Sequence, residues 1–169
     1  MPYVIRIHND AGYVVLPHTH AEDENVVVVR GNWYLGAGER FDSSSLQRLE
    51  PGAYGFVPRR MSHFAWSESA TTIQVHGIGP FSTDWVQAVY DLTASGVAHV
   101  TAGGRPGTPV PAAPTGCFTL EVGTTVRTRF GKGRVIGGLC SPSSQLTQYR
   151  IQNDDGDHFW ATAEKLEKQ

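Results

Sequence analysis

Apolar residues recur in short runs along the first half of the chain, and turn-forming residues separate these runs. The candidate strands cover residues 3–7, 13–16, 25–29, 33–35, 54–57 and 71–75. Most are rich in the β-branched and aromatic residues that fit a pleated, half-buried surface. Glycine, asparagine and proline lie between them, as in residues 9–12 and 50–52. Closely spaced strands of this kind predict an all-β sandwich or barrel.

The second half begins with an ambiguous stretch and a linker-like one. Residues 84–95 fit a helix that Asp84 caps, with Gln87 three positions later and Gly96 at its end, and they also fit a further strand. Residues 101–116 are rich in proline and glycine and predict a linker. Strand patterning then returns, over residues 122–129, 134–139, 146–152 and 158–161. The predicted organisation is a first domain over 1–100, a linker over 101–116 and a second domain over 117–169.

Composition narrows the class of protein. Hydrophobic residues make up 40% of the chain and charged residues 18%, which is typical of a globular protein. The 14 Lys and Arg nearly balance the 16 Asp and Glu, which argues against nucleic-acid or membrane-surface binding. No apolar run approaches the roughly 20 residues of a spanning helix, and the N-terminus lacks a signal-peptide pattern. Cys117 and Cys140 are too few for a disulfide framework. We therefore expect a reduced, cytoplasmic setting.

A set of metal-ligand residues follows the second candidate strand. His18 and His20 lie two positions apart, so along a strand their side chains share a face and both imidazoles can reach one point. Glu24 adds a carboxylate nearby, and His63 adds a third imidazole. Imidazole with carboxylate suits a divalent transition metal such as Fe, Mn, Ni or Zn. The alternative is that these four residues are buried polar groups that hold the core together without a metal.

The spacing of these residues resembles the two sequence motifs of the cupin superfamily. The first motif asks for Gly, five residues, His-x-His, three or four residues, Glu, six residues and Gly. It is matched at every position, by Gly12, His18, His20, Glu24 and Gly31. In the second motif Gly52, Pro58 and His63 are in place, whereas Arg60 replaces the usual glycine and Ser67 the usual asparagine. The resemblance covers about residues 3–81.

This resemblance implies a fold, a ligand set and an assembly. The fold would be a cupin barrel, that is, a jelly roll or double-stranded β-helix. His18, His20, Glu24 and His63 would be four metal ligands that face into it. Cupins usually have further strands before the first motif, whereas little chain precedes Gly12 here. Either the barrel is reduced or a partner subunit supplies an edge strand, so we expect a homodimer.

Several further residues are candidates for the cavity. Gln74 and His76 share one face of a strand, and if that face is inward they are candidate catalytic groups, with His76 as general acid or base. Otherwise they are hydrogen-bonded core or rim residues. Tyr34, Phe64 and Trp66 would line the cavity or pack in the core.

The remaining charged candidates are less specific. Arg59 and Arg60 lie in a loop before His63, where they either bind a carboxylate or phosphate of a substrate or remain solvated. His8, His99 and His158 have no other ligand-type residues around them, and we expect all three on the surface.

Residues 117–169 resemble a small SH3-like or Tudor-like barrel. The resemblance rests on a Val-Gly-x-x-Val start at residue 122 and an acidic-Gly turn at residues 154–156. Tyr149, Phe159 and Trp160 would form an aromatic cage for a cationic side chain, or would simply pack within the hairpins. This module is a candidate site for a protein partner.

Three functions follow. The first is a metal-dependent enzyme of oxygenase or isomerase type that acts on a small organic molecule, because Fe, Mn or Ni would keep coordination positions open beyond four protein ligands. The second is a non-catalytic sensor that binds a small molecule and reads a protein partner through residues 117–169. The third, a structural or storage role, leaves the intact ligand set unexplained.

Overall fold

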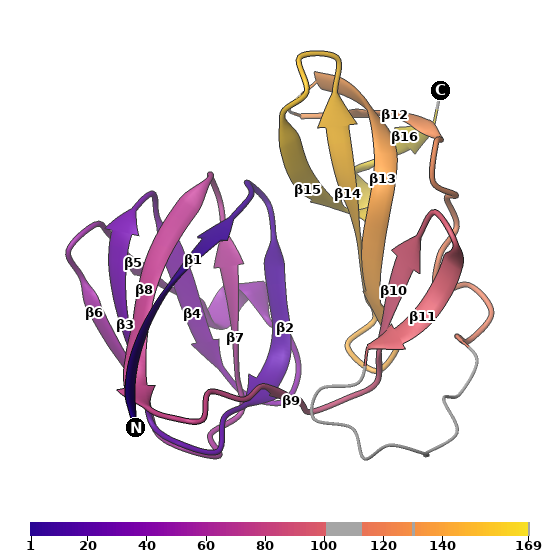
Figure 1. Cartoon of the computed structure of the whole chain (residues 1–169). Helices are drawn as coiled ribbons and strands as arrows, with labels where there is room; N and C mark the ends of the chain where they lie inside the picture. The colour runs from indigo at the N-terminus through magenta and orange to yellow at the C-terminus, as the bar shows by residue number, and fades with distance from the viewer. Residues whose placement is uncertain (101–112, 130, 169) are drawn as a thin grey trace. The chain divides into compact units, whose positions relative to one another are not determined.

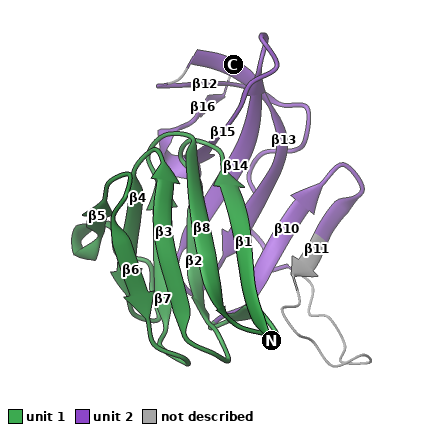
Figure 2. Cartoon of the chain, turned by 60° about the vertical axis from the view of Figure 1, so that its left-hand side comes forward, with its two compact units in different colours: residues 1–86 green, residues 87–169 purple. Residues whose placement is uncertain are grey.

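The chain forms two compact units built from strands. The computed structural model describes residues 1–100, 113–129 and 131–168, with only the backbone described for residues 98–100. The units are Met1–Val86 and Gln87–Gln169 (Figure 2). Within the described residues the elements are strands and two short 3-10 helices, with no α-helix. The predicted all-β class is therefore confirmed.

Two antiparallel sheets make up unit 1 (Figure 1). The first contains, in spatial order, β1 (Pro2–Asn9), β8 (Thr71–Ile78), β3 (Glu24–Arg30) and β6 (Tyr54–Val57). The second contains β5 (Gln47–Leu49), β4 (Trp33–Ala37), β7 (His63–Ser67), β2 (Val14–Thr19) and β9 (Asp84–Trp85). The pairings among the described strands close neither sheet into a barrel.

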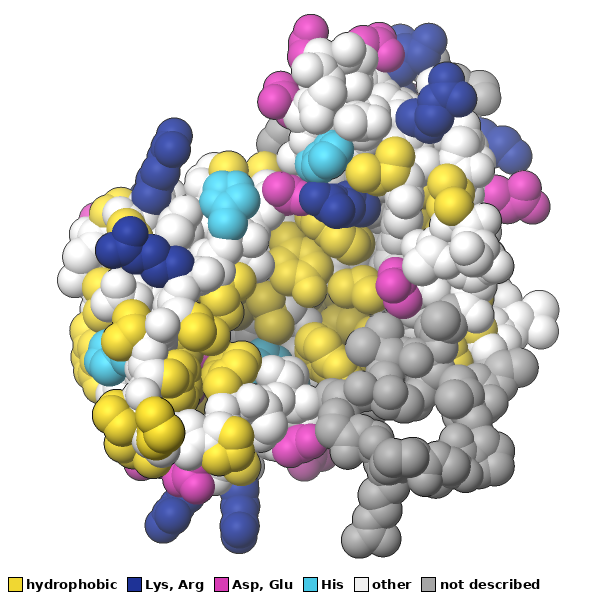
Figure 3. All heavy atoms as spheres, viewed as in Figure 1, with side chains coloured by type: hydrophobic (Ala, Val, Ile, Leu, Met, Phe, Trp, Pro, Cys, Tyr) yellow, Lys and Arg dark blue, Asp and Glu magenta, His cyan; other side chains and the backbone are white. Residues whose placement is uncertain are grey.

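The inner faces of the two sheets share one hydrophobic core. Val26 and Val28 of β3 and Ile73 of β8 are almost fully buried, and they pack in one cluster with Trp33 of β4 and Ala65 of β7. The outer face of the first sheet is different: hydrophobic side chains gather there at the surface (Figure 3), and four of them are more than half exposed. These four are Val4, Tyr54, Phe56 and Ile78.

A bulge in β2 sets which side chains enter the interior. Val15 pairs with Ala65 and His18 pairs with His63, so three steps along β2 match two steps along β7. The extra residue shifts the inward-outward alternation by one position. Val15 and His18 therefore line the same cavity. Pro17 lies in the irregular segment, where a residue without an N–H leaves no ladder hydrogen bond unmade.

Unit 2 is organised around one long strand. Its sheet contains β10 (Val89–Thr93), β11 (Gly96–Val100), β12 (Thr125–Thr128), β13 (Gly131–Ser141), β14 (Leu146–Asn153), β15 (His158–Thr162) and β16 (Glu167–Lys168). β13 pairs with β10, β12 and β14. Residues 84–95 contain β9 and β10, so of the two alternatives for this stretch the strand is correct and the helix is wrong. Val89, Tyr90 and Leu92 are buried in β10, and their pairing with two strands outweighs the local capping pattern.

The boundary between the units differs from the predicted one. The first predicted domain ran to residue 100, but β10 and β11 belong to unit 2 because β10 pairs with β13. Residues 101–112 of the predicted linker lie outside the described residues. The sheet of unit 2 thus includes strands from before the linker, and its described pairings close no barrel. The SH3-like barrel over residues 117–169 stays a prediction.

The two cysteines are joined. Cys117 and Cys140 form a disulfide, and both pack with Tyr90 in a buried cluster of unit 2. Disulfides are typical of oxidising compartments, so this pairing lends no support to the expected reduced, cytoplasmic setting. The described part of the chain also contains no helix with the length and apolar character needed to span a membrane.

Candidate metal centre

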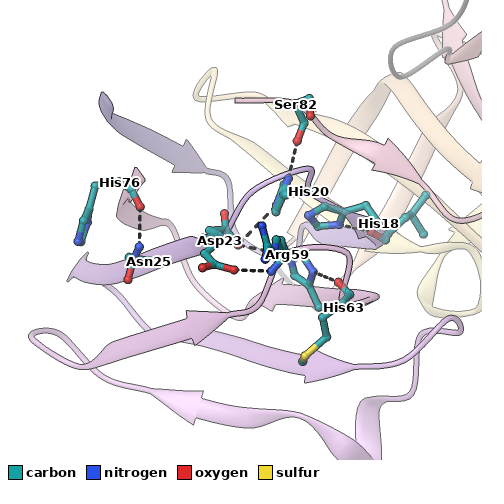
Figure 4. A network of polar contacts seen from close by, with 11 residues as sticks. His18, His20, Asp23, Asn25, Arg59, His63, His76 and Ser82 are labelled. Atoms are coloured by element: carbon teal, nitrogen blue, oxygen red, sulfur yellow. Dashed lines mark hydrogen bonds and ion pairs between the residues drawn. The ribbon is translucent and has the colours of Figure 1, made fainter. Parts of the chain in front are cut away.

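Three histidines from two neighbouring strands converge in the interior of unit 1 (Figure 4). His18 lies in β2, His20 directly follows that strand, and His63 begins β7. One ligand nitrogen from each ring lies within 4.8 Å of the other two. All three residues are buried, with exposed fractions of 2–6%. The predicted convergence of these imidazoles is therefore confirmed, and their geometry is that of a possible metal site.

Main-chain carbonyl groups orient all three rings. Each Nδ1 donates to a backbone oxygen: His18 to Leu16 at 2.8 Å, His63 to Met61 at 3.0 Å, and His20 to Ser82 at 2.6 Å. A carbonyl oxygen only accepts, so Nδ1 of each neutral ring carries the proton and Nε2 presents its lone pair. This is the tautomer that an Nε2-bound metal requires.

Glu24 stands beside two of the histidines. It begins β3, in the opposite sheet, and its Oε2 lies 3.5 Å from Nε2 of His20 and 3.4 Å from Nε2 of His63. Nε2 of His20 is buried and makes no hydrogen bond. A buried polar atom without a partner is costly, and coordination to a cation would satisfy it. The donor set of imidazole nitrogens and a carboxylate therefore fits a divalent transition metal.

The protonation states of His18 and Glu24 suit the same purpose. Burial and the nearby His63 lower the pKa of His18 to about 3, so this ring is neutral at pH 7. Burial alone would raise the pKa of Glu24, but the adjacent His20 and His63 outweigh it and lower the pKa to about 2. Burial opposes the charged form of His20 as well, yet Glu24 raises the pKa of that ring. A neutral imidazole and an ionised carboxylate are the forms that bind metals.

A largely apolar cavity of about 260 Å³ adjoins the histidines. Trp33, Phe81 and Trp85 contribute aromatic surface to its wall. Beyond the four predicted ligands, its polar lining consists of Asn9, Tyr13 and Thr83, and no lysine or arginine lines it among the described residues. The sequence pattern did not indicate these residues of the cavity wall. The inward position of Trp33, for example, is set by the register of its pairing with β7 and not by a local pattern.

Gln74 and His76 lie on the wrong face of β8 for the predicted role. They alternate with the buried Ile73 and Val75, and Ile73 lines the cavity. Gln74 accepts a hydrogen bond from Nε of Arg6 at 3.4 Å. His76 lies apart from the three converging histidines (Figure 4). Neither residue lines the cavity, so the condition for their predicted catalytic role, an inward face, is not met.

The three aromatic residues predicted for the cavity wall also lie elsewhere. Tyr34 and Trp66 pack on each other with ring centroids 4.9 Å apart, and neither lines the cavity. Phe64 is fully buried and packs against Phe41, with ring centroids 5.3 Å apart. Of the two roles considered for Phe64, packing in the core is the one it has.

The two departures from the second motif have clear structural roles. Arg60 has a φ of 61°, the left-handed conformation for which glycine is the usual residue. The Ser67 hydroxyl is buried and donates to the backbone oxygen of Asp10 at 2.9 Å, directly after the end of β1. The side chains of Arg59 and Arg60 are exposed and do not line the cavity, which agrees with the solvated alternative.

The remaining histidines lie outside the centre. His8 is exposed, and its Nδ1 lies 3.2 Å from the Thr72 hydroxyl. His158 contacts Arg150 and Gln152 in unit 2. The side chain of His99 lies outside the described residues.

Comparison with known proteins finds similar solved structures but no related sequence. The sequence matches no protein-family model and no curated protein. A solved cupin superfamily protein from Desulfitobacterium hafniense has 13% identity over 47% of this chain and 68% of its own, with a TM-score of 0.41. A cupin-2 domain protein from Shewanella frigidimarina has 15% identity over 46% and 71%, with a TM-score of 0.39. A sugar phosphate isomerase of the cupin superfamily from Silicibacter pomeroyi has 22% identity over 66% and 72%, with a TM-score of 0.44.

These neighbours are all described as cupins. Their TM-scores lie below 0.5, so they carry no argument about the activity of this chain.

Proposed function

We propose that this chain is a metal-binding protein of the cupin type that takes up a small organic molecule in the cavity beside its metal. His18, His20, Glu24 and His63 would hold a divalent transition ion. The observation that carries the proposal is the convergence of three buried imidazoles whose Nδ1 atoms all donate to backbone carbonyls. The motif spacing around these residues supports it independently of the geometry.

The chemistry of such a centre would combine a bound ion with an apolar chamber. When bound, the ion would supply Lewis acidity and coordination positions for an oxygen-containing ligand. The walls that Trp33, Phe81 and Trp85 contribute would exclude water and orient the organic molecule. Glu24 would neutralise part of the charge of the ion, because it is ionised at neutral pH.

Between the two enzyme types, the cavity favours oxygenase-type chemistry over isomerisation. An isomerase that moves a proton needs a general base within reach of its substrate. The described lining contains no His, Asp or Glu beyond the four proposed ligands. With Gln74 and His76 facing outward, Tyr13 is the one other titratable side chain of the described lining, and a neutral phenol accepts a proton less readily than an imidazole or a carboxylate.

A non-catalytic sensor is the second candidate. The observation that favours it is unit 2, a compact body with its own buried core and disulfide, which a one-domain enzyme would not require. Under this alternative unit 2 would bind a protein partner.

The homodimer predicted from the sequence also remains a proposal, and light scattering on the purified protein tests it.

The experiment that tests the proposed function is elemental analysis of protein purified without a metal-affinity tag. We expect close to one equivalent of iron, manganese or nickel per chain in the wild type. A His18→Ala, His63→Ala double variant should lose it, whereas His8→Ala should keep it, because His8 is exposed and distant from the cluster in sequence. Circular dichroism verifies that each variant is folded. No metal in the wild type after reconstitution, or full metal in the double variant, would refute the proposal.

A further inference from the structure

An unpaired amide lies in the wall of the cavity. Along β1 the burial alternates, so that Tyr3, Ile5 and Ile7 face inward, and Asn9 continues this face. Asn9 is 6% exposed, and both Ile7 and Asn9 line the cavity. The Nδ2 atom of Asn9 is buried and has no hydrogen-bond partner. Asn9 thus holds an unused donor group in the wall of the cavity.

Such a group is unfavourable in the protein alone. A buried donor without a partner loses its hydrogen bonds to water and gains none in return, and most buried polar groups in proteins avoid this state. Replacing Asn9 by an apolar residue would remove the penalty without disturbing the alternation of β1. The position therefore fits a donor that is completed by a molecule in the cavity.

Asn9 and the metal centre lie at opposite ends of the sheet. β1 runs along the full length of β8 (Figure 1), where Val4 pairs with His76 and Asn9 pairs with Thr71. His76 also pairs with Asn25, the neighbour of Glu24. The five steps along the strand from Val4 to Asn9 correspond to about 16 Å at the usual rise of a strand. Both Glu24 and Asn9 line the cavity, so the cavity extends along the sheet from the metal centre to Asn9.

The stretch between the two ends is apolar. Its wall is formed by Val15, Val26, Leu35, Ala65 and Ile73. A cavity of about 260 Å³ that extends over this length is slender. Since no lysine or arginine lines its described wall, nothing there would neutralise a phosphate or a second carboxylate.

We propose that the cavity binds an elongated, mostly apolar molecule in which a polar head lies at the metal centre and a hydrogen-bond acceptor lies at the Asn9 amide. The acceptor would be a carbonyl or ether oxygen, because Nδ2 donates. The assignment of the head rests on the proposed function, whereas the assignment of the far end rests on Asn9 alone. Asn9 is thus a specificity-determining residue and takes no part in metal binding.

Two matched probes test this assignment by isothermal titration calorimetry. The first is 4-phenylbutanoate, and the second is 4-(4-acetylphenyl)butanoate, which adds a carbonyl acceptor at the end remote from the carboxylate. We expect nickel-loaded wild-type protein to bind the acetyl probe about tenfold more tightly, as one added hydrogen bond would give. Asn9→Leu should abolish this preference, so that the two probes bind with similar affinity.

A second readout requires no ligand. Asn9→Leu should raise the melting temperature of the ligand-free protein, since it removes the unpaired amide. Equal affinities of the wild type for the two probes would overturn the proposal, as would an undiminished preference in Asn9→Leu or a failure of both probes to bind.

Metal-free protein separates this inference from the proposed function. If both probes bind equally well with and without nickel, the head does not reach a metal and the proposed function fails on that point. An acetyl preference that disappears in Asn9→Leu would still support the role of Asn9. Conversely, nickel-dependent binding without an acetyl preference would uphold the metal centre and overturn the role of Asn9.

Discussion

The backbone N–H of Arg60 donates to the carbonyl oxygen of His20 at 2.8 Å. This hydrogen bond ties the loop after β6 to the main chain of a candidate metal ligand. Arg60 makes it from the left-handed region, with a φ of 61°, while its side chain is exposed. The contact therefore depends on a backbone conformation that glycine adopts more readily than arginine.

Replacing Arg60 by glycine should stabilise the protein slightly. The substitution keeps the hydrogen bond to His20 and relieves the left-handed strain, and the greater freedom of glycine in the unfolded chain offsets part of the gain. We expect the free energy of unfolding in urea to rise by up to about 1 kcal/mol with unchanged metal content. Arg59→Gly is the matched control: Arg59 has no positive φ, so this variant should lose about 0.5–1 kcal/mol. A destabilised Arg60→Gly variant would contradict this account.

Two glycines of the sequence motifs should differ sharply in their tolerance of alanine. A Cβ at Gly31 would lie 2.6 Å from the backbone oxygen of Ala70, and the φ of Gly31 is 76°. At Gly52 the φ is 87°, but a Cβ would meet nothing within 4 Å. Gly31→Ala should therefore cost about 3 kcal/mol through clash and strain together. Gly52→Ala should cost only about 1 kcal/mol, through strain alone. Equal losses in denaturant melts would show that the contact at Gly31 is readily relieved.

The disulfide should contribute to the stability of unit 2. Cys117 and Cys140 are separated by 23 positions, and closing a loop of this length restricts the unfolded chain. Cys117→Ser, Cys140→Ser should lower the free energy of unfolding by about 3 kcal/mol. Metal content should not change, because the candidate ligands all belong to unit 1. Mass spectrometry after alkylation adds a direct check: the native protein should gain no label until it is reduced. Rapid labelling without reductant would disprove the pairing.

Asp91 should make the stability of unit 2 depend on pH. Burial raises the pKa of this carboxyl in the folded protein. The folded state then keeps its proton to higher pH than the unfolded chain, so the free energy of unfolding falls as pH rises above the usual Asp value. Asp91→Asn has no such loss, and at pH 7 it should be more stable by on the order of 0.5 kcal/mol, since solvent screens this partly exposed group.

The pH profile supplies the decisive comparison for Asp91. The advantage of Asp91→Asn should vanish when the pH is lowered below the usual Asp value, because the wild-type carboxyl is then protonated in both states. Asp154→Asn, at an exposed turn position, serves as the control and should match the wild type throughout. An advantage of Asp91→Asn that persists in acid would point to a packing effect instead.

The sequence was sufficient for most strands of unit 1, though not for β5 or β7, and for the convergence of the histidines. Short β-branched runs and fixed motif spacings are local signals, and they predicted β1, β3 and β8 together with His18, His20 and His63. The face that each strand turns inward was not predictable in the same way. A shift of one position reverses every side chain of a strand, and this error placed Gln74 and His76 in the cavity.

The other differences arise from contacts between distant segments. Residues 84–95 carry a helix-like capping pattern, yet β10 is fixed by its pairing with β13, more than forty positions later. The disulfide likewise depends on β13, which brings Cys140 to Cys117. Asn9 gave no sequence signal at all, because an unpaired amide becomes visible only when all of its neighbours are placed.

The carbonyl groups that orient the three histidines belong to Leu16, Met61 and Ser82, and none of these contacts uses a side chain. Every residue type carries a backbone oxygen, so evolutionary drift at these three positions can proceed without disturbing the imidazole tautomers. Two homologues of this protein could then share an identical metal geometry while differing at every residue that supports it. A sequence alignment would not reveal this shared geometry, whereas a superposition of the two main chains would.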